Sequence, residues 1–209
     1  MKDRLIISLA PYTRIKEKLS EPHRHWHTYS RHVAPMIEQI SRESLGLYDP
    51  FAVFLAALYH DSVYFTDDTV YADNEFASAQ FMRRELAGEV PEQKLAAAEL
   101  FILATQSHVE ESVLYDLDQA YHEDLRYFLD LDVGIFRQDP ALVLEFERDI
   151  RKEFKQYDDQ LYYAGRKAVL EKFAARDHIY VSKRFEDSNQ QAKANLNFLI
   201  NKLDELYHA

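Results

Sequence analysis

The sequence predicts an all-α protein built as a single domain of roughly eight to ten helices. The chain has 209 residues, 47% of them hydrophobic, which is enough for one domain with a sizeable core. It contains only four glycines and six prolines, far below the average usage of about 7% and 5%. Because these residues interrupt regular structure, their scarcity predicts long helices and disfavours both glycine-rich phosphate loops and all-β folds with many turns.

Apolar residues at helical spacing predict the first three helices. They are expected within residues 1 to 20, from about His25 to Leu45, and from Pro50 to about Phe65. Pro22 ends the first helix, and Pro35 predicts a kink in the second. The third helix begins after Asp49 as its N-cap and is apolar on all sides until His60, which is typical of a buried helix.

The rest of the chain is predicted to be helical as well. Residues 66 to 74 form a polar loop, and either Asp73 or Asn74 caps the helix that follows. The expected helices are Glu75 to Leu86, Glu92 to His108, Asp124 to Phe136, Pro140 to Tyr157, Leu161 to Arg176 and Asp187 to Tyr207. Without an internal repeat or linker, residues 1 to 209 are expected to form one domain. The C-terminal helices, about 140 to 209, are expected to pack on a core at about 20 to 140 that carries the candidate site.

Charge and composition exclude several classes of protein. The net charge is −11, from 25 Lys and Arg against 36 Asp and Glu, so the chain lacks the basic footprint of a nucleic-acid-binding domain. The first residues do not resemble a signal peptide, and no apolar run approaches the ~18 residues of a membrane span, so we expect a cytoplasmic protein. The absence of cysteine excludes disulfide scaffolds, thiolate metal sites and thiol catalysis.

A cluster of histidines is the first candidate site. His23, His25, His27 and His32 fall within ten residues. On a helix, His23 and His27 share a face, whereas His32 lies well off it. Together with Trp26, the cluster fits a metal-binding segment, a surface patch or a structural polar network.

Acidic residues in apolar surroundings form the second and third candidates. Asp61 follows His60 at the polar end of the apolar helix, where its lost hydration must be offset by a cation or by hydrogen bonds, unless the helix end meets solvent. Asp130 and Asp132 stand within the apolar segment FLDLDVGIF and point about 200° apart on a helix. Only one of them is therefore expected to face the same cavity as His60.

In their order and spacing, His27, His60, Asp61 and Asp132 resemble the HD superfamily of metal-dependent phosphohydrolases. Arg24, three residues before His27, and the helix LAALYHD fit the same pattern. More narrowly, a bacterial family of HD-type phosphohydrolases without an assigned substrate is similar in the segments EPHRHWHTYSRHV, LAALYHDSVY, DNEFASA, ILATQSH and FLDLDVGIF. The similarity continues through GRKAVLEKF, IYVSKRF and AKANLNFLI, and so covers about residues 12 to 203.

The resemblance implies an HD-type helical fold with one divalent transition-metal ion, held by His27, His60, Asp61 and Asp132. Asp130 is the alternative to Asp132. Two imidazoles and two carboxylates suit Mn, Fe, Co, Ni or Zn better than Mg, which prefers oxygen ligands alone. The implied activity is hydrolysis of a small phosphate ester, of which a nucleotide is one candidate, by a metal-activated water.

The resemblance leaves the remaining roles open. Family members often carry an acidic residue shortly after the His-Asp pair, but the fourth position on is Phe65 here. The candidate catalytic residues are Asp61, Asp68, Glu75 and His108, and the candidate substrate-binding residues are Arg24, Trp26 and Tyr64. A solvated loop or helix end explains the acidic residues and His108 equally well, and an ion pair explains Arg24.

Two other functions stay open. One is a non-catalytic HD-fold module that binds a nucleotide or a protein partner and keeps a structural metal. The other is an HD-fold di-iron oxygenase, which needs two further histidines, here His108 and His122. We expect a small-molecule partner and no membrane, and a homodimer is compatible with the sequence.

Overall fold

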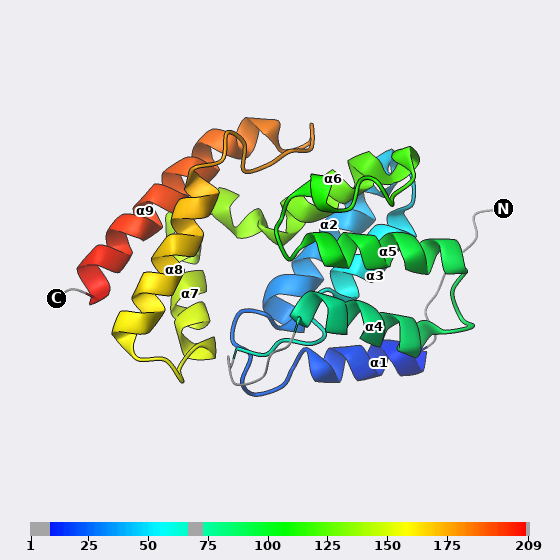
Figure 1. Cartoon of the computed structure of the whole chain (residues 1–209), viewed down its shortest axis with the longest axis horizontal. Helices are drawn as coiled ribbons and strands as arrows, with labels where there is room; N and C mark the ends of the chain where they lie inside the picture. The colour runs from blue at the N-terminus through cyan, green and yellow to red at the C-terminus, as the bar shows by residue number, and fades with distance from the viewer. Residues whose placement is uncertain (1–8, 67–72, 208–209) are drawn as a thin grey trace. The chain divides into compact units, whose positions relative to one another are not determined.

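The structure, a computed structural model, describes residues 9–66 and 73–207. Within these ranges it contains nine α-helices and no strand (Figure 1), which confirms the all-α prediction. The chain divides into two compact units, residues 1–132 and 133–209. The packing of the C-terminal helices on the rest of the chain stays a prediction. Among the described helices, none is long and apolar enough to cross a membrane.

Unit 1 is built around helix α3. Its helices are α1 (Leu9–Lys18), α2 (Ala34–Glu43), α3 (Pro50–Tyr59), α4 (Asn74–Leu86), α5 (Glu92–Ala104) and α6 (His122–Asp132). Helix α3 packs against α2, α4, α5 and α6, and seven of its ten residues are buried, as its apolar sequence predicts. The predicted N-cap is also present, because Asp49 accepts hydrogen bonds from the backbone N–H groups of Phe51 and Ala52. Of the two candidate caps for α4, Asp73 is the one whose side chain accepts from the helix, at Phe76 N–H.

The second helix begins nine residues later than predicted. Helix α2 starts at Ala34, after a π-helical turn at Tyr29–Val33, and the chain from 25 to 28 is not helical. The Thr28 side chain caps the π-helical turn by accepting from the backbone N–H of Arg31. Pro35 lies in the first turn of α2, directly after the π-helical turn, where its missing N–H costs α2 little; the predicted kink stays a prediction.

Four predicted helix ends also differ from the structure. Helix α3 ends at Tyr59 rather than near Phe65, α5 ends at Ala104 rather than His108, α6 ends at Asp132 rather than Phe136, and the helix expected to reach Tyr157 ends at Glu153. After α3 and α6, apolar residues recur past the last helical residue. Periodicity therefore extended the predictions into turns that are packed but not helical.

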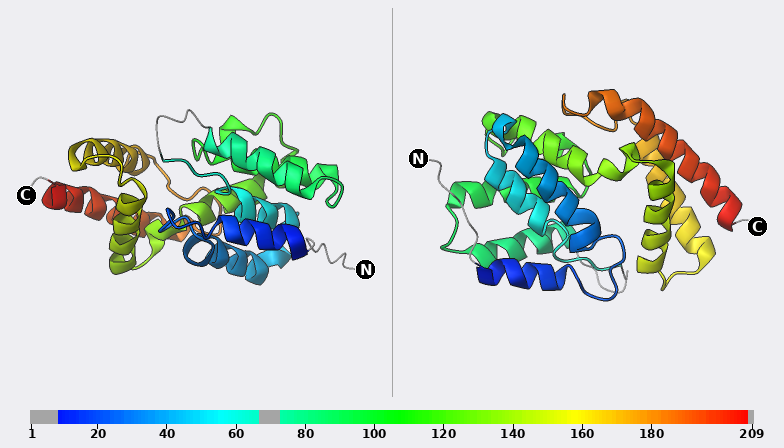
Figure 2. Two further views of the ribbon diagram at one scale, coloured as in Figure 1. Left: turned by 90° about the horizontal axis from the view of Figure 1, so that it is seen from below. Right: turned by 180° about the vertical axis from the view of Figure 1, so that it is seen from behind.

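Unit 2 contains three α-helices and two short 3₁₀ turns. The helices are α7 (Pro140–Glu153), α8 (Asp159–Ala174) and α9 (Asn189–Tyr207), and the turns are Gly134–Arg137 and Glu186–Ser188. Helix α9 packs against both α7 and α8 (Figures 1 and 2). The Asn195 side chain of α9 donates to the carbonyls of Phe136 and Gln138, both at 2.8 Å, and so ties the end of the turn to the helix.

Candidate metal centre

Three side chains of unit 1 bring metal-ligating atoms together. They are His32, His60 and Asp61, whose ligating atoms all lie within 4.8 Å of one another. Nε2 of His32 lies 3.0 Å from Nε2 of His60, and Oδ2 of Asp61 lies 3.0 Å and 3.5 Å from Nε2 of His60 and His32. Because zinc binds imidazole nitrogen and carboxylate oxygen at about 2.0–2.2 Å, one cation of this size can reach all three groups.

Asp132, the last residue of α6, adds a second carboxylate. Its Oδ1 lies 3.0 Å from Nε2 of His32 and 3.2 Å from Nε2 of His60. Asp130 is also buried, but two helical residues earlier its side chain starts about 200° around α6. Of the two predicted alternatives, Asp132 is therefore the one that meets the histidines.

The four residues reach one another because each stands at the end of a helix. His32 belongs to the π-helical turn before α2, His60 is the C-cap of α3, and Asp132 is the last residue of α6. Since α2 and α6 both pack against α3, these ends meet. Asp61 joins its neighbour His60 because α3 has already ended, as the use of two adjacent residues requires.

Hydrogen bonding orients His60 toward the carboxylates. Its Nδ1 lies 3.1 Å from the carbonyl of Ala57, and because a carbonyl only accepts, Nδ1 carries the proton and Nε2 faces the cluster. Burial by itself would lower the pKa of His60, but Asp61 and Asp132 outweigh it and raise that pKa well above its usual value. Burial would conversely raise the pKa of each carboxyl, but His60 and the other histidines hold both well below the usual range.

The residues present fit a bound transition-metal ion. Oδ2 of Asp61 is buried and has ion-pair contacts with the imidazoles of His60 and His32, but no further hydrogen-bond donor is described for it. The ion pairs described for Asp132 are likewise with histidines. Two imidazoles and two carboxylates form the mixed nitrogen and oxygen shell that Mn, Fe, Co, Ni and Zn accept.

His27, which was predicted as a ligand, lies outside this cluster, and His32 stands in its place. The His27 ring packs on the Tyr64 ring with centroids 4.3 Å apart and meets the His32 ring edge-on at 5.6 Å. The prediction assumed a continuous helix, on which His32 would point away from the face of His27. That assumption does not hold, because residues 25 to 28 are not helical and a π-helical turn follows them.

Two of the predicted substrate-binding residues, Arg24 and Trp26, are buried. The guanidinium of Arg24 donates to three backbone carbonyls. The Trp26 ring is buried 6.3 Å from the His32 ring, with the guanidinium of Arg31 over it.

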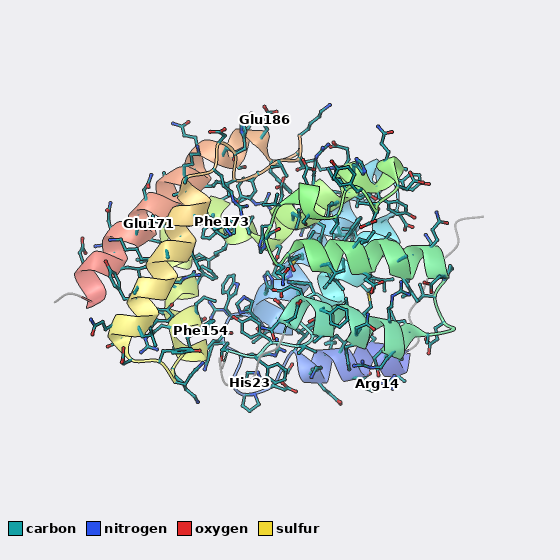
Figure 3. The ribbon with its side chains drawn as sticks, viewed as in Figure 1. Arg14, His23, Phe154, Glu171, Phe173 and Glu186 are labelled. Carbon is teal, nitrogen blue, oxygen red and sulfur yellow. The ribbon has the colours of Figure 1, made fainter. Side chains whose placement is uncertain are left out.

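A pocket of about 310 Å³ adjoins this region. It is lined by Lys18, Glu21, His23, Arg24, Val63, Tyr64, Phe65 and Thr66. His23 is exposed at the edge of unit 1 (Figure 3), so it is not one of the buried candidate ligands. Because Tyr64 lines this pocket, its side chain can contact a ligand bound there.

Two of the predicted proton-transfer residues stand beside the cluster. Glu75 lies in the first turn of α4. Its pKa is raised, first by burial and also by the charges of Asp73 and Asp61, while His108 opposes the change. Asp68 lies outside the described residues.

His108 is held against the cluster in an unusual conformation. Its Nε2 lies 2.9 Å from Oδ2 of Asp132, so it is not the solvated helix end that was the alternative. Its φ of 52° falls in the left-handed region, which costs a residue other than glycine about 1–3 kcal/mol. Apolar periodicity carries no signal for such a backbone angle.

His122 takes no part in the cluster. It begins α6 and donates from Nε2 to the carbonyl of Leu117, whereas Asp132 ends the same helix about 15 Å away. Of the two additional histidines that a di-iron oxygenase needs, only His108 therefore reaches the centre.

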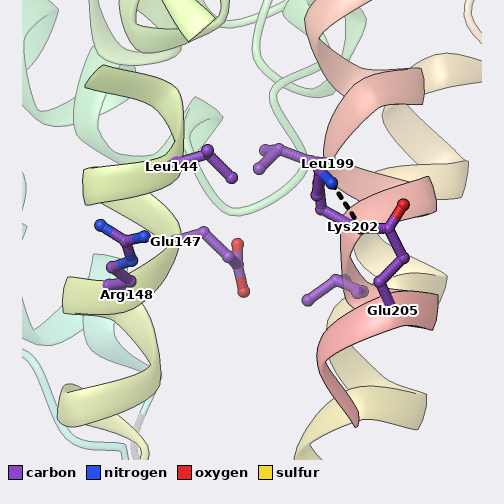
Figure 4. A pocket seen from close by; sticks show the side chains of 7 residues that line it. Leu144, Glu147, Arg148, Leu199, Lys202 and Glu205 are labelled. Atoms are coloured by element: carbon purple, nitrogen blue, oxygen red, sulfur yellow. Dashed lines mark hydrogen bonds and ion pairs between the residues drawn. The ribbon is translucent and has the colours of Figure 1, made fainter. Parts of the chain in front are cut away.

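Unit 2 contains a pocket of a different character. Its volume is about 260 Å³ and it is lined by Leu144, Glu147, Arg148, Leu199, Lys202, Leu203 and Glu205 of α7 and α9 (Figure 4). Lys202 pairs with Glu205, and buried Glu147 pairs with Arg166. The lining contains no histidine, so this pocket offers no mixed nitrogen and oxygen shell.

Comparisons of the chain with models of protein families, with curated proteins and with solved structures find no match.

Proposed function

We propose that the protein is a metal-dependent phosphohydrolase that cleaves a small phosphate ester, with one divalent transition-metal ion held by His32, His60, Asp61 and Asp132. The observation that carries the proposal is the convergence of the His32 and His60 imidazoles with the Asp61 and Asp132 carboxylates, whose facing atoms lie 3.0–3.5 Å from the two Nε2 atoms. The resemblance of the sequence to HD phosphohydrolases supports the same class of reaction. When bound, such an ion supplies an activated water and neutralises charge that develops on the phosphoryl group.

The surrounding residues orient the candidate ligands and supply a proton donor. The carbonyl of Ala57 fixes the orientation of the His60 ring. His108 contacts Oδ2 of Asp132, and Oδ1 of the same carboxylate faces His32 and His60. Glu75 has a raised pKa, so it retains its proton to higher pH than an ordinary glutamate does. We assign it the role of proton donor to the leaving group.

The proposal is tested by metal content and phosphate release together. Protein purified without chelator or affinity histidines is expected to contain about one transition-metal ion per chain by mass spectrometry. Loaded with Mn²⁺, Co²⁺ or Zn²⁺, it should release phosphate from a panel of nucleotides and sugar phosphates. Asp61→Asn, which keeps the shape of the side chain, should lose metal and lower turnover by about 10³-fold or more.

Two results would contradict the proposal. Folded wild-type protein that takes up no added ion would remove the metal centre altogether. Full metal occupancy and nucleotide binding without release of phosphate from any ester would instead identify a non-catalytic binding module.

A further inference from the structure

Arg24 joins the two segments of chain that carry the candidate ligands. Its side chain is buried, with the whole residue only 4% exposed. Nη1 donates to the carbonyls of His27 at 3.1 Å and Asp61 at 2.8 Å, and Nη2 donates to the carbonyl of Ser62 at 3.3 Å. One guanidinium thus ties the segment that leads to His32 to the turn that contains Asp61.

The turn at Asp61 depends on such a contact because α3 has ended. Helix α3 stops at Tyr59, and residues 60 to 66 are not helical. Carbonyls beyond a helix end need partners other than the helical hydrogen bonds. Arg24 provides a partner for the carbonyls of Asp61 and Ser62.

An aromatic contact supports the same arrangement. The guanidinium carbon of Arg24 lies 5.6 Å from the centre of the Tyr64 ring. That ring packs on His27, which in turn meets the His32 ring. Arg24, Tyr64 and His27 therefore form a chain of contacts that leads to the His32 ring.

We propose that Arg24 is a positioning residue of the metal centre, which holds Asp61 and the segment before His32 in place and does not contact the phosphate ester. The inference rests on the proposed metal centre. A planar guanidinium with a fixed fork reaches carbonyls on two segments at once, whereas a lysine ammonium is a single point donor. Residues that orient metal ligands in this way typically change metal affinity by about 10–100-fold when they are replaced.

The test uses Co²⁺ alone as the probe and compares Arg24→Met and Arg24→Lys with the wild-type chain. The visible absorption of bound Co²⁺ reports both affinity and ligand geometry, and circular dichroism reports folding. We expect the Kd to rise about 10–100-fold in Arg24→Met and at least about threefold in Arg24→Lys, with an altered spectrum in both. Arg42→Met is the matched control, because the Arg42 side chain is 73% exposed and pairs with Glu38; its Kd should stay within about twofold.

The outcomes separate this inference from the proposed function. Wild-type affinity and spectrum in both Arg24 variants would overturn the positioning role, and a raised KM for the ester at unchanged Co²⁺ affinity would make Arg24 a substrate contact. If Arg24→Met does not fold, Arg24→Lys decides by the same threefold limit. Wild-type protein that binds no Co²⁺ would reject the metal centre itself, and the positioning role with it.

Discussion

Buried carboxylates are neutralised differently in the two units. In unit 2, Glu147 accepts from the Tyr162 hydroxyl at 2.7 Å and from Nε of Arg166 at 2.9 Å. In unit 1, the ion pairs described for Asp61 and Asp132 are with the imidazoles of His32, His60 and His108.

This difference separates a structural carboxylate from a candidate ligand. Arginine keeps its charge at all ordinary pH values, so Arg166 neutralises Glu147 permanently. Imidazole, unlike guanidinium, can release its proton when a metal ion binds and then offers the ion a lone pair. Burial alone therefore does not identify a functional acid, but burial among histidines does point to a cation.

The largest change in metal affinity and turnover is expected when an imidazole of unit 1 is removed. His32→Gln should weaken Mn²⁺ or Co²⁺ binding by about 100-fold or more and lower turnover at least as much, because it removes a ligand atom of the cluster. His27→Gln should change metal affinity by less than about tenfold, since His27 only packs against Tyr64 and His32. Titration calorimetry measures both, and the opposite order would restore His27 as the ligand.

A smaller effect is expected from Glu75, which is partly buried near the cluster without joining it. Its raised pKa means that it is protonated below that pKa and loses the proton above it. As proton donor it should make turnover fall as the pH rises through this value. Glu75→Gln should lower kcat about 10–100-fold and abolish that limb of the pH–rate profile.

This prediction has two controls: the metal affinity of the Glu75 variant and the pH profile of a variant at a surface acid. Metal affinity should be unchanged in Glu75→Gln, and Glu92→Gln should leave the whole profile intact because the Glu92 side chain is 75% exposed. An unchanged limb in Glu75→Gln would assign the proton transfer to another group.

The smallest effect on the metal centre is expected from unit 2. Glu147→Gln keeps the size of the side chain but leaves the guanidinium of Arg166 without its carboxylate, so the free energy of unfolding should fall by about 2–4 kcal/mol. Urea unfolding of the full chain measures this change. Metal affinity should be the same as in wild type, and a reduced affinity would contradict the division between structural and ligating carboxylates.

The elements predicted correctly depend on local chemistry. The buried helix α3 and its Asp49 cap follow from apolar periodicity and from the capping of exposed N–H groups. The predicted ends of α3 and α6 were wrong because apolar residues recur in the turns that follow, after the helical hydrogen bonds stop.

The site was predicted in part. His60, Asp61 and Asp132 meet as the sequence suggested, because each marks a polar interruption of an apolar segment. His32 was passed over because its place relative to His27 depends on the π-helical turn at Tyr29–Val33. No periodic pattern reports such a turn.

An all-helical chain without cysteine and a buried helix with a His-Asp pair at its polar end follow from the sequence alone, because periodicity and hydration are properties of short segments. Only the tertiary structure decided that His32 joins that pair, that His108 reaches Asp132 from a left-handed backbone angle, and that Arg24 holds carbonyls of two segments. These contacts are made where the chain leaves its helices, and the path of the backbone there is set by packing between residues far apart in the sequence.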